Sequence, residues 1–161
     1  VDVLLRGDTK TSIRGPHKLQ IDLRVVPAAS FGAALQYFTG SKEHNVKLRG
    51  RARDRSLTIN EYGVFELKVG QEADPSPPAS KGKAVAGRTE ADVYAAVGLP
   101  WIPPELREGR DEIERAARGE LPVLIELADI RGDLHMHTTA TDGEDTLADM
   151  ARAAIARGLS Y

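Results

Sequence analysis

Apolar and polar residues alternate most regularly in residues 19–26, where the apolar positions are Leu19, Ile21, Leu23 and Val25. Alternation with a period of two predicts a β-strand in a sheet with one buried face, so Asp22 is expected on the open face. Gly15 and Pro16 predict a turn just upstream. Residues 9–14 are therefore expected to pair with this strand as a hairpin.

Three helices are predicted next. A buried stripe at helical spacing indicates a helix from Ser30, a good N-cap, to Gly40. The members of the stripe are Phe31, Ala34, Leu35 and Phe38. Ser41 is a good N-cap for a second helix to about Arg55, and Thr89 for a third through Val97. Short strands are expected at residues 57–60, 64–69 and 83–86, with a loop at residues 70–82 inside a hairpin.

The segment from Asp133 to Asp142 carries candidate metal chemistry. On a strand beginning near Ile130, one face would carry Asp133, His135 and His137, and the turn at Asp142 and Gly143 would return another carboxylate. Mixed nitrogen and oxygen ligands suit zinc, manganese or iron, although the histidines could also be simply solvated. A helix with a core stripe should follow, built on Leu147, Met150, Ala151, Ala154 and Ile155. Strand, loop and helix in this order are typical of the opening of a β/α repeat.

Composition narrows the classes of protein. The chain of 161 residues has no cysteine, which excludes disulfides and thiolate zinc sites. Its net charge of −2 divides into +6 for residues 1–60 (11 basic, 5 acidic) and −8 for residues 61–161 (11 basic, 19 acidic). A basic first part suggests a polyanion partner such as nucleic acid, although a basic helix is often just a solvated face. No apolar run reaches membrane-spanning length.

Several short motifs carry a family resemblance. Residues 21–27, residues 37–41, Asn45, Arg49 and residues 60–62 resemble the palm and thumb of family X DNA polymerases. Residues 133–142 are similar to the first motif of the polymerase and histidinol phosphatase (PHP) metal domain. That order is typical of bacterial family X polymerases with a C-terminal nuclease domain.

The resemblance implies an α+β fold: an antiparallel palm sheet segment, a small α/β thumb and the first β/α unit of a truncated metal-dependent β/α-barrel-like domain. The expected boundaries are palm 1–40, thumb 41–108, linker 109–128 and start of the PHP domain 129–161. The palm aspartates of the Gly-x-Asp-x-Asp pattern are absent from this sequence, and further PHP ligands would come from later strands. The chain alone, read as an internal segment, is therefore expected neither to polymerise nor to cleave.

The resemblance also implies roles for single residues. Asp22 would bind the catalytic magnesium beside the primer 3′ hydroxyl. The nucleotide-binding set would be Tyr37, Phe38, Gly40, Ser41 and Asn45. DNA would be bound by Lys47, Arg49 and Arg51, and the contacts that change on thumb closure would involve Arg24, Glu61 and Tyr62. The PHP site would hold manganese or zinc through His135, His137 and Asp142.

The function expected from this resemblance is gap-filling DNA repair synthesis with a linked metal-dependent 3′–5′ exonuclease. Its partners would be gapped or primer-template DNA and deoxynucleoside triphosphates, and the protein would be a monomer in the cytoplasm, associated with the nucleoid. Two alternatives stay open. One is a non-catalytic DNA-binding module that keeps the polymerase motifs as scaffold, and the other is a PHP-type phosphatase of small molecules.

Overall fold

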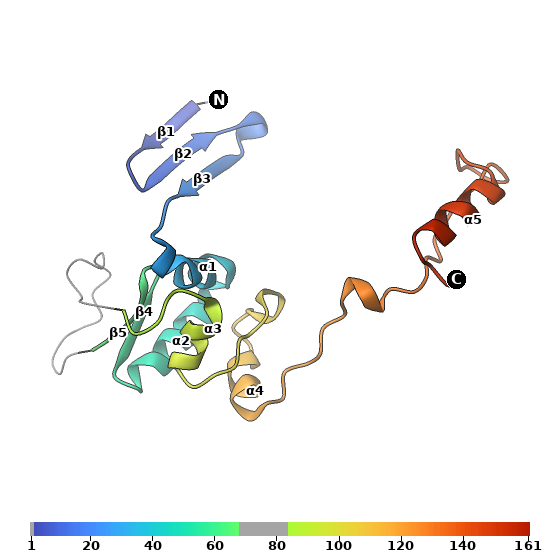
Figure 1. Cartoon of the computed structure of the whole chain (residues 1–161). Coiled ribbons are helices and arrows are strands. Elements are labelled where there is room, and N and C mark those ends of the chain that lie inside the picture. The colour runs from blue at the N-terminus through green and yellow to red at the C-terminus, as the bar shows by residue number, and fades with distance from the viewer. Residues whose placement is uncertain (1, 68–83) are drawn as a thin grey trace. The chain divides into compact units, whose positions relative to one another are not determined.

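A computed structural model describes residues 2–67 and 84–161, and it divides the chain into two compact units, residues 1–121 and residues 122–161. The expected loop at residues 70–82 lies outside the described residues, as do residue 83 and the end of the strand expected at residues 64–69. Figure 1 traces the order of the elements along the chain.

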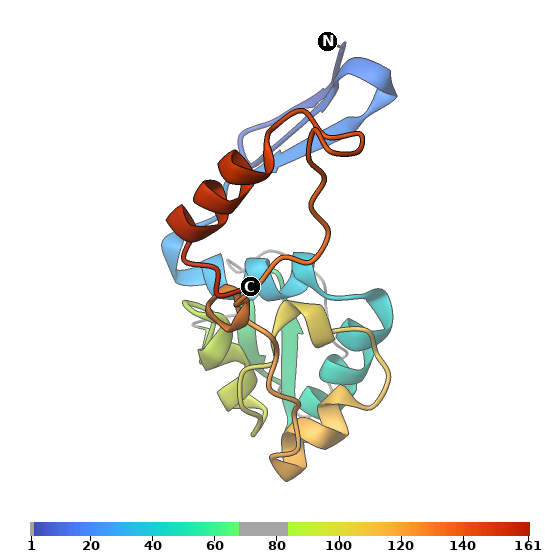
Figure 2. The ribbon, with the colours of Figure 1, turned by 90° about the vertical axis from the view of Figure 1, so that its right-hand side faces the viewer.

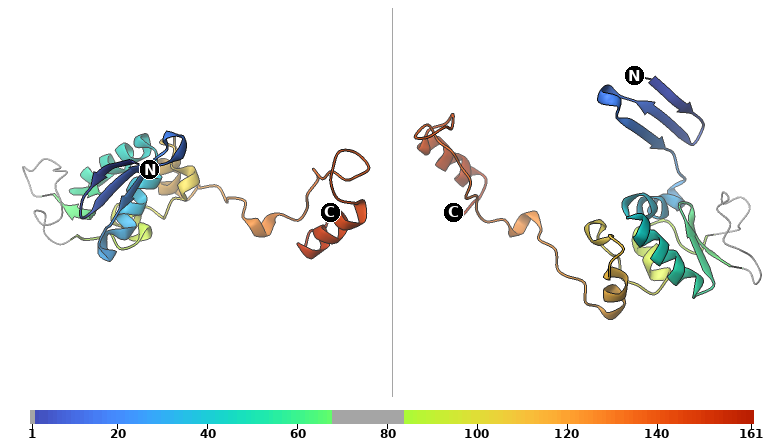
Figure 3. Two further views of the ribbon diagram at one scale, coloured as in Figure 1. Left: turned by 90° about the horizontal axis from the view of Figure 1, so that it is seen from above. Right: turned by 180° about the vertical axis from the view of Figure 1, so that it is seen from behind.

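The first unit opens with a three-stranded antiparallel sheet in the order β1-β2-β3 (Figure 3). Its strands are β1 (Asp2–Arg6), β2 (Lys10–Arg14) and β3 (Gln20–Arg24). The predicted hairpin is confirmed, because β2 pairs with β3 in a register that sets Ser12 opposite Asp22. Asp22 therefore lies in the middle of an edge strand.

The expectation that this sheet buries one face is wrong for the described residues. Ile21, Leu23 and Val25 are all exposed, and Leu23 keeps 64% of its surface accessible. The alternating segment does form a strand as predicted, but no described element packs over the apolar side chains of that strand. Periodicity reports which face can be buried, and it does not supply the element that buries it.

Helix α1 (Phe31–Thr39) forms where it was predicted, but it turns a different face inward. Of the predicted stripe only Ala34 is buried, while Phe31, Leu35 and Phe38 are exposed. The other buried positions of the helix are Gly32, Ala33 and Gln36. The reason is a close approach: a Cβ on Gly32 would lie 2.1 Å from the carbonyl carbon of Thr89. Ser30 precedes the helix, but its side chain makes no capping hydrogen bond, so the predicted cap is also wrong.

Two predicted N-caps are confirmed. Ser41 Oγ accepts a hydrogen bond from the His44 amide at 3.0 Å at the start of α2 (Lys42–Arg53). Thr89 forms a reciprocal capping box with Asp92 at the start of α3 (Glu90–Ala96). Strands β4 (Leu57–Asn60) and β5 (Gly63–Glu66) form a two-stranded antiparallel sheet, and Val64 also bridges to Ala86.

The core of the first unit lies between α1, α2, α3 and the β4-β5 sheet (Figure 2). Helix α4 (Glu112–Arg118) closes this core with Ile113 and Ala116, although residues 109–128 were expected to be a linker. The packed part of the first unit thus extends past residue 108. No helix in the described ranges is long and apolar enough to cross a membrane.

The second unit contains a 3₁₀ turn (Leu127–Asp129) and α5 (Leu147–Ala156). The strand expected near Ile130 is not formed, and residues 130–138 carry no strand. The hydrogen bonds of Arg131 and Asp133 to Ser160 and Tyr161 are too few to make a ladder. The stripe of α5 is likewise largely open, with Leu147 and Ile155 exposed. The described residues thus form a mixed α/β fold with small antiparallel sheets, and the start of a β/α barrel stays a prediction.

Candidate functional site

Asp22 presents a half-exposed carboxylate from the centre of β3. Gln20 Nε2 donates to its Oδ1 at 3.2 Å, and Lys10 Nζ lies 3.7 Å from Oδ2. A hydrogen bond from Ser12, followed by the one from Gln20, lowers the pKa of Asp22. The group is therefore ionised at neutral pH, as a ligand for a hard cation must be.

Arg24 links the strand of Asp22 to two predicted site segments. Its guanidinium lies 5.0 Å from the centre of the Phe38 ring, and its Nη1 is 4.0 Å from Glu61 Oε1. Phe38 in turn packs edge-on against Tyr37, with ring centres 5.0 Å apart. Tyr62 follows in the same turn, where its amide donates to Asn60 Oδ1 at 2.9 Å. The structure thus brings three predicted residues, Arg24, Phe38 and Glu61, together.

The turn between α1 and α2 is fixed by Arg107. The Ser41 amide donates to Arg107 O at 2.9 Å, and Arg107 Nη1 donates to Thr39 Oγ1 at 2.6 Å. A Cβ on Gly40 would lie 3.3 Å from the His44 ring and 3.6 Å from the Asn45 amide nitrogen. Gly40 is therefore closely packed against the His44 ring inside the protein, a reason for glycine additional to the expected approach of a sugar.

Arg107 is itself almost fully buried, with 1% of its surface accessible. Its guanidinium pairs with Glu90 Oε1 at 2.6 Å and lies 5.3 Å from the centre of the Tyr94 ring. Burial would raise the pKa of Glu90, but the hydrogen bonds from Arg107 and Trp101 outweigh it and lower the pKa. The charged pair therefore persists at neutral pH, and it ties the turn to α3.

Asn45 lies on the first turn of α2 with both ends of its amide engaged. Its Oδ1 accepts from Gln36 Nε2 at 2.9 Å, and its Nδ2 donates to Tyr37 O at 3.0 Å. A backbone carbonyl can only accept, so this contact fixes which end of the amide is the nitrogen. One N–H of Nδ2 is left for another acceptor, and the side chain is only partly buried.

Next to Asn45, the imidazole of His44 is completely buried and hydrogen-bonded at both nitrogens. Nδ1 lies 2.6 Å from Glu112 Oε1, and Nε2 lies 2.9 Å from the Tyr94 hydroxyl. Burial lowers the pKa of His44, and burial raises the pKa of Tyr94. The consistent state is a neutral imidazole that donates from Nδ1 to an ionised Glu112 and accepts the Tyr94 proton at Nε2.

The three basic residues expected to bind DNA all contact the protein itself. Lys47 Nζ donates to Arg110 O, and Arg49 Nε donates to Asn45 O at 3.3 Å. Arg51 donates to the carbonyls of Val97 and Gly98 at 2.9 and 3.2 Å. Arg51 thereby donates hydrogen bonds to carbonyl groups at the C-terminal end of α3. The side chain of Lys47 remains exposed.

Gln36, Tyr94, Arg107 and Glu112 were not predicted from the sequence to be parts of this site. Their contacts join segments that are far apart in the chain, so no local pattern reports them. A signal did exist for His44: it is four residues before Leu48 and eight before Ala52, both buried. A histidine in line with two core residues of one helix face is expected to need buried partners.

In the second unit, a turn brings Asp142 back to His137. Gly143 N donates to Thr138 O at 3.0 Å, and His137 Nδ1 lies 2.5 Å from Asp142 Oδ1. This hydrogen bond, the largest influence, lowers the pKa of Asp142. The ring centres of His135 and His137 are 5.0 Å apart. The predicted return of a carboxylate through this turn is therefore what the structure shows.

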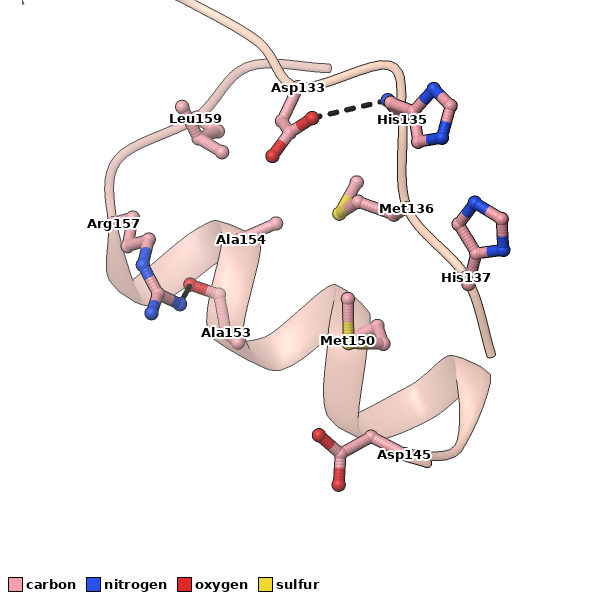
Figure 4. Close-up of a pocket in the computed structure, with 10 residues that line it drawn as sticks. All are labelled: Asp133, His135, Met136, His137, Asp145, Met150, Ala153, Ala154, Arg157 and Leu159. Atoms are coloured by element: carbon pink, nitrogen blue, oxygen red, sulfur yellow. Dashed lines mark hydrogen bonds between the residues drawn. The ribbon is translucent and has the colours of Figure 1, made fainter. Parts of the chain in front are cut away.

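Asp133, however, does not join the two histidines on one face as expected. In Figure 4 its Oδ1 accepts a hydrogen bond from the backbone amide of His135 at 3.1 Å, whereas both imidazoles lie on the other side of the chain from this carboxylate. These residues line an open pocket with Met136, Met150 and Asp145. No group of three acidic or histidine side chains in residues 2–67 and 84–161 is gathered as a ready metal cage. Residues 133–137 form no hydrogen-bonded strand, so their alternate side chains are not held on one face as predicted.

The donors in this pocket nevertheless fit a divalent metal. A carboxylate at Nδ1 fixes the tautomer of His137 and leaves Nε2 as the nitrogen that can bind. His135 lies beside it with an exposed ring. Neutral imidazoles with carboxylates suit zinc or manganese better than magnesium.

Comparison with known proteins agrees with this geometry. Residues 34–108 match the family model of the DNA polymerase beta thumb. The chain is 40% identical over 162 aligned residues, 99% of its length, to the DNA polymerase/3′-5′ exonuclease PolX of Bacillus subtilis (strain 168). The chain belongs to family X of the DNA polymerases.

Two mammalian family X polymerases match the chain over part of its length. DNA polymerase lambda of Rattus norvegicus is 31% identical over 58% of the chain, and DNA-directed DNA/RNA polymerase mu of Homo sapiens is 32% identical over 55%. The chain spans 26% of the length of the Bacillus protein and 16% of each of the other two. It therefore corresponds to a limited part of a family X polymerase.

Proposed function

We propose that the protein carrying this chain fills short gaps in DNA by templated nucleotidyl transfer. The observation that carries the proposal is the meeting of Arg24 with both Phe38 and Glu61. Arg24 lies two residues from Asp22 on β3, and Phe38 lies three residues before Ser41. This contact connects the strand of the acidic residue with the turn of the nucleotide-binding motif.

Asp22 is the residue proposed to act at the reacting end of the primer. Its carboxylate is exposed and ionised, and Lys10, the cation that it pairs with, is only a loose partner at 3.7 Å. An exposed pair at that distance is worth little, so it is easily exchanged for a metal ion. Magnesium bound there would supply the charge that activates the 3′ hydroxyl and offsets the leaving pyrophosphate.

The turn from Tyr37 to Ser41 and Asn45 are proposed to hold the incoming deoxynucleotide. The free N–H of Asn45 Nδ2 is a donor, and every base pair presents an acceptor at its minor-groove edge. Such a contact monitors the shape of a correct pair and does not distinguish its sequence. Arg24, Glu61 and Tyr62 would change partners as the thumb closes, with Lys47, Arg49 and Arg51 facing the DNA.

The second unit is proposed to supply ligands to a linked metal-dependent 3′–5′ exonuclease. His137 and Asp142 already form a hydrogen-bonded pair, and His135 stands beside them. Manganese or zinc would be the metal, and gapped DNA the shared substrate of both activities. The protein is proposed to act as a monomer in the cytoplasm, near the nucleoid.

Asp22→Asn in the full-length protein tests the polymerase proposal. The substitution keeps the size of the side chain and removes the charge that holds the metal. Gap filling is expected to fall at least about a hundredfold, since a lost carboxylate ligand costs several kcal/mol in the transition state. Affinity for gapped DNA should stay within about twofold, because an isolated exposed charge contributes little.

Asp8→Asn is the matched control. Asp8 is exposed in the turn before β2 and has no part in the proposed site. It should leave gap filling unchanged. If Asp22→Asn incorporates nucleotides as fast as Asp8→Asn, the protein does not use this carboxylate, and a non-catalytic DNA-binding module becomes the better account.

A further inference from the structure

We propose that His44 is a positioning residue for nucleotide selection: held between Glu112 and Tyr94, it fixes the Gly40 turn and the Asn45 amide. The proposal rests on the nucleotide-binding role proposed above for Asn45 and the turn. It adds a set of buried residues that do not touch the nucleotide. These residues are His44, Glu112, Tyr94 and Gln36, called here the His44 network.

The ring of His44 has no freedom to rotate. It comes from α2, and its two nitrogens meet Glu112 on α4 at 2.6 Å and Tyr94 on α3 at 2.9 Å. Neither His44 nor Tyr94 has any accessible surface. Three helices are thus joined at one imidazole, and a buried ring with both nitrogens engaged has a single orientation.

The His44 network reaches Asn45 through a fourth helix, α1. The Tyr94 hydroxyl also interacts with the Gln36 side chain on α1, which lowers the pKa that burial raises. Gln36 Nε2 then donates to Asn45 Oδ1 at 2.9 Å, and Gln36 has only 1% of its surface accessible. Gln36 therefore holds the Asn45 amide from its buried side, and this contact orients the remaining N–H of Asn45 Nδ2.

The same imidazole supports the Gly40 turn. A Cβ on Gly40 would lie 3.3 Å from His44 Cδ2, so the backbone of the turn rests against the ring. The His44 amide donates to Ser41 Oγ at 3.0 Å, which fixes the start of α2. A shift of the ring would displace both the turn and Asn45, the two parts proposed to contact the nucleotide.

The composition of the network favours positioning over stability. Glu112 Oε2 is buried and accepts no hydrogen bond from the described part of the chain, which costs free energy. An apolar side chain would fill the same space without that cost. What the polar network adds is a defined geometry, because each donor meets one acceptor.

A double-mutant cycle in the full-length protein tests the proposal. Tyr94→Phe removes only the hydroxyl, and Asn45→Ala removes the amide. Single-turnover incorporation on gapped DNA gives the apparent Kd of the correct deoxynucleotide and the maximal rate. Tyr94→Phe should raise the apparent Kd about fivefold to tenfold, as for one lost hydrogen bond, with the DNA affinity unchanged. In the Asn45→Ala background it should add less than about twofold.

Thr89→Ala is the control for a merely structural effect. It removes the N-cap of the helix that carries Tyr94, so it lowers the melting temperature but leaves the hydroxyl in place. Well below that temperature its apparent nucleotide Kd should equal that of the wild type. Glu112→Gln, which keeps the shape of the side chain, should reproduce the non-additive pattern of Tyr94→Phe.

Three outcomes overturn the proposal. The first is an unchanged nucleotide Kd in Tyr94→Phe while Asn45→Ala weakens binding. The second is a Kd effect that adds fully to that of Asn45→Ala, and the third is the same effect in Thr89→Ala. If Asn45→Ala itself binds nucleotide like the wild type, the role proposed for Asn45 fails, and the inference fails with it.

Discussion

Buried polar residues decide the geometry of the first unit at the scale of single side chains. His44, Arg107 and Glu112 are all nearly inaccessible, and each is paired with a group from another segment. The burial of Arg107 and Glu112 could not be predicted from the sequence, because charged residues in a segment rich in acidic and basic residues are expected to be solvated. His44 could have been recognised, because it is in line with two buried residues of its helix. Asp22, by contrast, could be placed on an open strand surface, because alternation is a local property.

The pairing of His44 predicts that the first unit loses stability in mild acid. The pKa of His44 is lowered in the folded state, so on acidification the unfolded chain binds the proton first. The stabilisation is complete above the usual value of 6.5 and is lost as the pH falls toward the folded pKa. Hydrogen exchange of the α2 amides measures this loss. The free energy of opening obtained from it should decrease by up to ~1.4 kcal/mol for each pH unit of acidification.

The lowered pKa of Glu112 extends this loss to more acidic pH. Glu112 contributes stability that is present above its usual value of 4.5 and disappears below it. His44→Gln, which cannot titrate, should remove the part of the slope just below 6.5. It should also weaken the lower part, because the hydrogen bond from His44 is the main influence that lowers the pKa of Glu112. Protection that stays constant from pH 7 to pH 5 in the wild type would show that His44 is not buried as a neutral ring.

At the scale of elements, helix starts were predictable and helix faces were not. Ser41 and Thr89 cap α2 and α3 as expected, because a cap depends on residues within one turn. The predicted inward face of α1 was wrong except at Ala34, since Gly32 permits a backbone approach to Thr89 that large apolar side chains would prevent. The sequence contains both possible faces, and only the neighbouring helix selects between them.

Gly40, which precedes α2, and Gly50, which lies inside it, should respond in opposite ways to replacement by alanine. Gly50 lies inside α2, and a Cβ there would meet nothing within 4 Å. Gly50→Ala should therefore raise the free energy of unfolding by about 0.5–1 kcal/mol through the lost entropy of the unfolded chain. Gly40→Ala should lower it, because its Cβ would crowd the His44 ring. Thermal unfolding of the two variants checks this prediction, and destabilisation by Gly50→Ala would contradict it.

At the scale of the whole molecule, two compact units carry two sets of candidate ligands. Asp22 lies in residues 1–121, and His137 with Asp142 lies in residues 122–161. The family resemblance predicted that the two candidate metal sites lie in different parts of the chain, and their residues lie in two separate compact units. The strand predicted for the histidines is not formed, because the segment hydrogen-bonds across to Ser160 and Tyr161, which belong to no strand.

The most direct measurement follows one labelled primer on gapped DNA, in which full-length protein can both extend and shorten the 3′ end. Asp22→Asn should shorten the primer and fail to extend it, and His137→Ala should extend the primer and fail to shorten it. The account predicts this reciprocal loss, because each substitution removes a ligand from only one unit. Loss of both activities in either variant, or of neither activity in both, would contradict it.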